Sequence, residues 1–179
     1  MYFCGINYCQ VELSRDLKLR FTYKNLSTAL EVTKNKFTTV TIEDIQNDII
    51  DEFSMFEDWE ERYQYMIDLG KDLPLIDDQY KTDSNIIKGC QSKVWVHAEM
   101  KDDKIEFTAD SDAIITKGII AILIRVFSNQ HPKDIIDADT DFIDKIGLKE
   151  HLSPTRANGL VSMVKQLKMY AIAYQTQLK

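Results

Sequence analysis

A cysteine preceded by a glycine is the residue pattern in this chain that could most directly carry chemistry. Residues 87–95 (IKGCQSKVW) place Gly89 and Cys90 just ahead of an alternating, strand-like segment. Glycine lets the backbone turn sharply, so this spacing predicts a thiol that is presented from a loop and held against a strand. Only the thiolate is a good nucleophile. The alternative is that Cys90 is a small buried core residue, because free cysteine is among the most buried residue types. The motif alone does not exclude this alternative.

The other potential metal ligands do not form a recognisable set. Cys4 and Cys9 lack the spacing of a zinc knuckle and a second ligand pair. Three cysteines in all do not indicate a disulfide framework, which favours a reducing compartment such as the cytoplasm. The histidines are scattered and are expected to be surface or structurally satisfied residues rather than metal ligands: His97, His131 and His151.

Composition narrows the class of protein further. With 179 residues, of which 44% are hydrophobic, the chain can form one compact domain with an extension. A net charge of −7 and a pI of about 5.0 argue against a general nucleic-acid binder, which needs a clustered basic surface. No stretch approaches the roughly 20 apolar residues of a membrane span, and no secretory signal is visible.

Residues 1–39 differ from the rest of the chain. Basic residues outnumber acidic ones there, whereas the following 140 residues are strongly acidic. The segment shows no sustained helical stripe, although 3–11 and 17–23 could form weak strands. We treat residues 1–39 as an N-terminal extension of uncertain order and hypothesise that the functional domain spans residues 40–179.

Two amphipathic helices are predicted before the cysteine. Thr41 followed by Asp44 resembles an N-cap with an acidic first turn, and isoleucines then recur at helical spacing as far as Phe53. A second helix begins after Asp58, and Gly70 is well placed to end it.

A small antiparallel sheet is predicted around and after the cysteine. Its three strands are expected at 86–87, 93–100 and 105–109, and residues 101–104 would form a charged hairpin turn. In the second of these strands, Trp95 is expected to belong to the core rather than to a partner contact.

Helices complete the predicted fold. Ser111 or Asp112 would cap a strongly apolar helix over 113–127 that packs on the sheet. Proline at the first helical position starts two later helices, at Pro132 and Pro154, and Gly147 would end a short helix between them. Helices, a small antiparallel sheet and more helices form an α+β pattern.

Four blocks, in the same order and spacing, resemble the SufE family of sulfur-acceptor proteins in iron–sulfur cluster assembly. They are 58–63 (DWEERY) with 67–70 (IDLG), 88–95 (KGCQSKVW), 109–113 (ADSDA) followed by 116–118 (TKG), and 152–160 (LSPTRANGL). The similarity runs from about Thr41 to the C-terminus and implies a SufE/NifU-like fold. It says nothing about residues 1–39.

The resemblance implies a function. Cys90 would accept persulfide sulfur from a SufS-like cysteine desulfurase, stimulate that enzyme, and pass the sulfur to a SufBCD-like scaffold. The protein would be a desulfurase activator rather than a stand-alone enzyme. It would need no cofactor of its own, since the pyridoxal phosphate (PLP) belongs to the desulfurase. We expect a monomer or weak dimer with no membrane or nucleic-acid partner.

The resemblance also implies supporting residues, each with an alternative role. Asp112 could hold the cysteine loop or tune the thiol, although a helix cap is the simpler interpretation. Arg156 could contact the desulfurase, or it could be an ordinary solvated arginine. The residues that flank the thiol are Gly89, Gln91 and Ser92, and beyond them Lys88 and Lys93, which could raise the thiolate fraction or simply be solvated.

Two other functions compete with sulfur transfer. An IscU/NifU-like scaffold for a cluster or zinc needs several thiolates, and Cys90 is the one cysteine after residue 40. A cysteine hydrolase needs a histidine near the thiol, and no histidine motif here matches that of a known cysteine protease.

A carrier thiol should also be shielded from oxidants, so we expect Cys90 to be at least partly buried in the free protein, on a loop able to swing outward.

Overall fold

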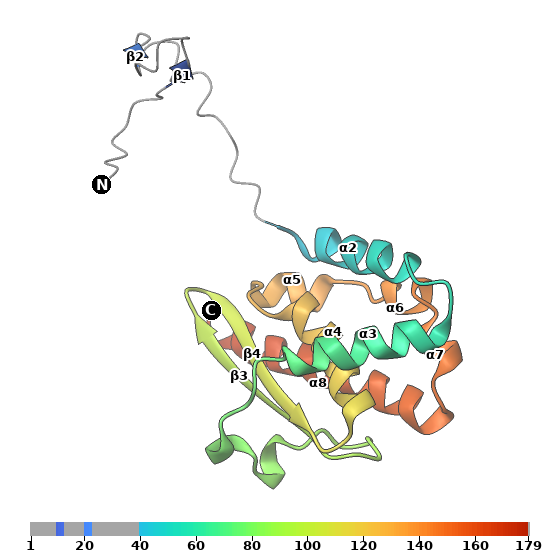
Figure 1. Cartoon of the computed structure of the whole chain (residues 1–179). Coiled ribbons are helices and arrows are strands. Elements are labelled where there is room, and N and C mark those ends of the chain that lie inside the picture. Colours follow the sequence, from blue (N-terminus) through green and yellow to red (C-terminus); the bar gives the residue numbers. More distant parts are fainter. Residues whose placement is uncertain (1–9, 13–19, 23–39, 179) are drawn as a thin grey trace. The chain divides into compact units, whose positions relative to one another are not determined.

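The computed structural model describes residues 10–12, 20–22 and 40–178 (Figure 1). The chain divides into two units, Met1–Thr39 and Val40–Lys179. In the first unit, strands β1 (Gln10–Glu12) and β2 (Arg20–Thr22) pair antiparallel. The remainder of the two predicted N-terminal strands, together with Cys4 and Cys9, lies outside the described residues. The hypothesis that the functional domain starts near Val40 stays a prediction.

The second unit has the predicted α+β order. Its elements are α2 (Ile42–Ser54), α3 (Trp59–Lys71), the 3-10 turns η1 (Asp78–Tyr80) and η2 (Asp83–Asn85), β3 (Val94–Lys101), β4 (Lys104–Ser111), α4 (Ile114–Phe127), α5 (Pro132–Asp137), α6 (Phe142–Lys145), α7 (Leu148–His151) and α8 (Pro154–Gln177).

The antiparallel hairpin forms where the sequence predicts it. Val94 pairs with Ser111 at one end of the ladder, and Lys101 pairs with Lys104 at the other. Asp102 and Asp103 have φ values of 49° and 63°, as a two-residue turn that matches the strand twist requires. Alternate residues of both strands face the core and are buried.

The sheet of the second unit has two strands rather than the three predicted. The segment at Ile86 makes an isolated bridge to Trp95, and the Ile87 amide donates to the Val94 carbonyl at 2.8 Å. A 3-10 turn precedes this segment, and Gly89, with φ of 92°, turns the chain away directly after it. The paired stretch is therefore too short to form a strand.

Helix α4 is the centre of the core. It contacts α3, α8 and β4 (Figure 1), and most of its side chains are buried. The α3–α4 contact depends on two glycines: a Cβ at Gly118 would lie 2.4 Å from the Met66 carbonyl oxygen, and one at Gly70 would lie 3.1 Å from the Gly118 nitrogen. The prediction that Gly70 ends α3 is therefore wrong. Gly70 lies inside the helix, where it allows the two backbones to approach closely.

The helix starts follow the sequence signals with one exception. Thr41 forms a capping box with Asp44, Asp58 caps α3, and prolines begin α5 and α8. The exception is α4, whose N-cap is Ala113 with no side-chain hydrogen bond. The predicted cap by Ser111 or Asp112 is wrong: the Ser111 hydroxyl accepts the amide of Ala113 at 3.3 Å, before the helix begins, and the Asp112 carboxylate bonds the end of the cysteine-bearing loop.

The last helix, α8, is tied to the sheet by two tyrosines. Tyr170 donates to the Val96 carbonyl at 3.2 Å, and Tyr174 donates to the Ala98 carbonyl at 2.7 Å. Both acceptors belong to β3, the strand that follows Cys90. These two bonds hold the C-terminal half of α8 against β3.

Candidate functional site

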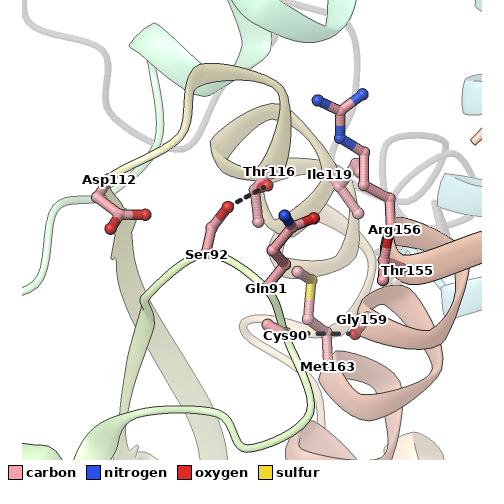
Figure 2. A pocket seen from close by; sticks show the side chains of 10 residues that line it. All are labelled: Cys90, Gln91, Ser92, Asp112, Thr116, Ile119, Thr155, Arg156, Gly159 and Met163. Carbon is pink, nitrogen blue, oxygen red and sulfur yellow. Dashed lines mark hydrogen bonds between the residues drawn. The ribbon is translucent and has the colours of Figure 1, made fainter. Parts of the chain in front are cut away.

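Cys90 lies in a cleft of about 400 Å³ where three segments meet (Figure 2). These segments are residues 88–92, which we call the cysteine loop, the β4–α4 junction with the first turns of α4, and the first turns of α8. The cleft is lined by Cys90, Gln91, Ser92, Asp112, Thr116, Ile119, Thr155, Arg156, Gly159 and Met163. Of the supporting residues predicted from the sequence, Gln91, Ser92, Asp112 and Arg156 are therefore brought together around Cys90.

Both ends of the cysteine loop are fixed by hydrogen bonds. At its start, the Ile87 amide is bonded to the Val94 carbonyl. At its end, the Lys93 amide donates to Oδ1 of Asp112 at 3.0 Å, and the Asp112 amide donates back to the Lys93 carbonyl at 3.2 Å. The Asp112 carboxylate therefore accepts a hydrogen bond from Lys93 instead of capping α4.

Gly89 is required by the shape of the loop. Its φ of 92° is a conformation that side-chain-bearing residues rarely adopt, and a Cβ there would lie 2.7 Å from Oγ of Ser162. Gly89 is not among the residues that line the cleft. It instead turns the chain so that Cys90 points toward α8.

Between these fixed ends, the loop is held by two long contacts. Thr116 Oγ1 lies 3.5 Å from Oγ of Ser92, and the Cys90 thiol lies 3.6 Å from the Gly159 carbonyl oxygen. Both are drawn in Figure 2. Because weak hydrogen bonds at such distances contribute little, the thiol's resting position depends mainly on packing.

The thiol itself is half-buried, as predicted for a shielded carrier. A Cβ at Gly159 would lie 3.4 Å from the sulfur, so the bare backbone of α8 forms the floor beneath it. Burial raises the pKa of the Cys90 thiol. Lys88 and Lys93 are both exposed, and the suggestion that they raise the thiolate fraction stays a prediction.

Asp112 and Arg156 lie on opposite sides of the cleft (Figure 2). Both are exposed. Asp112 is bonded to the loop end, whereas Arg156 projects from the first turn of α8 into solvent, where it could meet a partner. Their functional roles stay predictions.

Half of the residues that line the cleft were not predicted from the sequence. Thr116 and Ile119 come from α4, and Thr155, Gly159 and Met163 come from α8. Three of them lie inside the motif blocks: Thr116, Thr155 and Gly159. Their position within a block was the one sequence signal that could have indicated a place in the site. Ile119 and Met163 are buried members of helical apolar stripes, and such residues are not distinguishable from ordinary core by spacing alone.

The three histidines have structural partners elsewhere. His97 stacks on Tyr80 at 3.8 Å, the His131 ring accepts a bond from the Lys133 amide, and His151 stacks on Trp59 at 3.7 Å. None of them lines the cysteine cleft. Within residues 10–12, 20–22 and 40–178, no three His, Cys, Asp or Glu side chains are grouped as a metal site.

Two further expectations can be compared with the structure. Trp95 lies on the opposite face of β3 from the buried Val94 and Val96 and is half-buried, so its predicted place in the core is wrong. Among the described helices, none is both long and apolar enough to cross a membrane.

Known proteins with similar sequences define the class to which this site belongs. Residues 47–171 match the model of the SufE family, described as an Fe-S metabolism associated domain. An uncharacterized SufE-like protein of Rhizobium meliloti is 43% identical over 128 residues, covering 69% of this chain and 91% of its own. A second SufE-like protein, from Rhizobium etli, is 41% identical over 125 residues, covering 67% of this chain and 84% of its own.

A solved structure agrees on the fold. The solution structure of a hypothetical protein from Thermus thermophilus has a TM-score of 0.63 and 19% identity, with 74% of this chain and 96% of that chain covered. At that identity, the likeness concerns the fold alone. The family match and the two relatives together show that this chain belongs to the SufE family, whose domain functions in iron–sulfur metabolism.

Proposed function

We propose that this protein carries persulfide sulfur on Cys90 between a SufS-like cysteine desulfurase and a SufBCD-like scaffold, in the cytoplasm. The Cys90 thiol loses its proton, and the thiolate attacks the terminal sulfur of the desulfurase persulfide. A new sulfur–sulfur bond forms at Cys90, the partner's sulfur–sulfur bond breaks, and its electron pair stays on the partner cysteine as a thiolate. The sulfur changes carrier without an external oxidant or reductant. The earlier carbon–sulfur cleavage belongs to the partner's PLP.

The observation that carries the proposal is the placement of Cys90. It is the one cysteine in the family-matched region 47–171, and it lines a cleft to which three of the motif blocks contribute. A single accessible thiol is sufficient to carry one sulfur atom.

Burial of the thiol is consistent with a resting carrier. Because burial raises its pKa, Cys90 is mostly protonated at neutral pH, and oxidants react mainly with the thiolate. Reaction with a partner then requires the thiol to leave the floor formed by Gly159. The packing around Cys90 opposes that movement, and the two long contacts at Ser92 and Cys90 add little to it.

The alternative functions receive no support from the site. A cluster or zinc scaffold needs several ligands, whereas Cys90 is the single thiol of the matched region. A cysteine hydrolase needs a base within hydrogen-bond reach of the thiol, and no histidine lines the cleft. Stoichiometric iron or zinc in the purified protein would favour the scaffold instead.

Stimulation of a cysteine desulfurase tests the proposal. Sulfide or alanine release from cysteine is measured with and without this protein, in the presence of a reductant. We expect faster turnover with the wild type and with a Cys4→Ser/Cys9→Ser variant, and no stimulation with Cys90→Ser. Equal stimulation by Cys90→Ser would contradict the assignment of the carrier thiol.

A further inference from the structure

The outward side of α8 carries exposed apolar side chains. Val161 is 58% exposed, and Met169 and Ile172 are each 51% exposed. With Lys165, these residues recur at intervals of three or four positions and so share one side of the helix. We call these four residues the outer α8 face. Exposed apolar side chains that gather on one face are typical of a protein interaction site.

The charge of α8 differs from that of the rest of the protein. The helix contains Arg156, Lys165 and Lys168 and no acidic residue, although the whole chain has a net charge of −7. Lys168 donates to the carbonyls of Ile136 and Ala138, whereas Arg156 and Lys165 are exposed. The charge that α8 offers to a partner is therefore positive, and it fits an apolar surface bordered by carboxylates.

This face begins next to the cysteine loop. Gly159 lies under the thiol, and Ser162 lies so close to Gly89 that a Cβ on the glycine would be 2.7 Å from its Oγ. Val161 directly precedes Ser162 and faces solvent, about 100° around the helix from Ser162. From Val161 to Ile172, the face extends about 16 Å along the helix at 1.5 Å per residue.

A protein partner that reaches Cys90 must cover more than the cleft. Specific interfaces bury about 800 Å² on each partner, and their strongest contacts are apolar or aromatic anchors near the centre. We propose that the outer α8 face is a docking surface for the cysteine desulfurase, which contributes an apolar patch bordered by acidic side chains. This inference rests on the proposed function and specifies where the donor binds.

The test compares single substitutions on this face with a matched control. The face variants are Val161→Glu, Ile172→Glu and Lys165→Glu, and the control is Met55→Glu, which places the same charge on a 71% exposed methionine at the end of α2. Binding of the desulfurase is measured by calorimetry at low and high salt. We expect binding about tenfold or more weaker for the face variants, a salt-sensitive loss for Lys165→Glu, and no change for Met55→Glu.

A small-molecule persulfide serves as a control that distinguishes a loss of desulfurase binding from a loss of Cys90 reactivity. Glutathione persulfide should load Cys90 equally in all variants, since it needs no protein surface. Wild-type desulfurase affinity in Val161→Glu and Ile172→Glu, together with normal loading of Cys90, would overturn the docking surface while leaving the proposed function intact. Loss of a wild-type homodimer in these variants would assign the face to a second copy instead. Failure of the desulfurase to load even the wild type would overturn both.

Discussion

The Asp112 carboxylate accepts the amide hydrogen of Lys93 at 3.0 Å, and the Asp112 amide donates to the Lys93 carbonyl at 3.2 Å. This reciprocal pair joins the end of the cysteine loop to the β4–α4 junction. It lies just beyond the last pair of the β3–β4 ladder, Val94 with Ser111. The segment that can move independently is therefore confined to residues 88–92.

Removing the Asp112 carboxylate should loosen the loop. In Asp112→Ala the Lys93 amide loses its acceptor, so we expect a loss of about 1 kcal/mol in unfolding free energy and faster alkylation of Cys90 by iodoacetamide. Asp112→Asn keeps a side-chain oxygen at the same position and should behave nearly as the wild type. An unchanged alkylation rate in Asp112→Ala would show that the pair does not restrain the thiol.

The reactivity of Cys90 should depend on pH as expected of a buried thiol. Because burial raises its pKa, alkylation of the native protein should reach half its maximal rate at a higher pH than alkylation of the same thiol in urea, where the pKa is about 8.5. A native midpoint at or below the midpoint in urea would contradict the buried resting position.

The same pKa shift has a consequence for stability. The folded state binds the Cys90 proton more tightly than the unfolded state, so this contribution is fully present below the unfolded pKa and is lost as pH rises through the folded pKa. In urea titrations at increasing alkaline pH, Cys90→Ser should lose less stability than the wild type. Parallel losses in the two proteins would contradict the shift.

Two glycines should respond in opposite ways to alanine. Gly118→Ala places a Cβ 2.4 Å from the Met66 carbonyl oxygen, so the α3–α4 contact must open, at a cost of about 3 kcal/mol. Gly159→Ala meets nothing closer than the Cys90 sulfur at 3.4 Å, and alanine favours the helix by up to about 1 kcal/mol. Urea denaturation of both variants measures the contrast, and a Gly118→Ala protein as stable as the wild type would refute the close crossing.

Local signals in the sequence were sufficient for much of the fold. Capping residues at Thr41 and Asp58, the charged turn at 101–104 and the two helix-starting prolines act through nearby backbone groups. Each of these features was therefore predictable without knowledge of the tertiary structure. The α+β class followed from their order.

Features that depend on distant contacts were not predictable in this way. Gly70 is typical of a helix terminator, yet its role is set by Gly118, far along the chain. Asp112 has the position of a cap, yet its carboxylate bonds Lys93 across the hairpin. Similarly, Gly159 and Met163 line the cleft only because α8 packs beside the cysteine loop. In each case, tertiary packing decided between two locally acceptable roles.

The mass of the Cys90 peptide after incubation with a cysteine desulfurase and cysteine tests the central claim most directly. We predict an adduct of one sulfur atom on Cys90, which is removed by a reductant and does not form in Cys90→Ser. Absence of this adduct on an intact wild-type protein, under conditions in which the desulfurase itself carries a persulfide, would contradict the account.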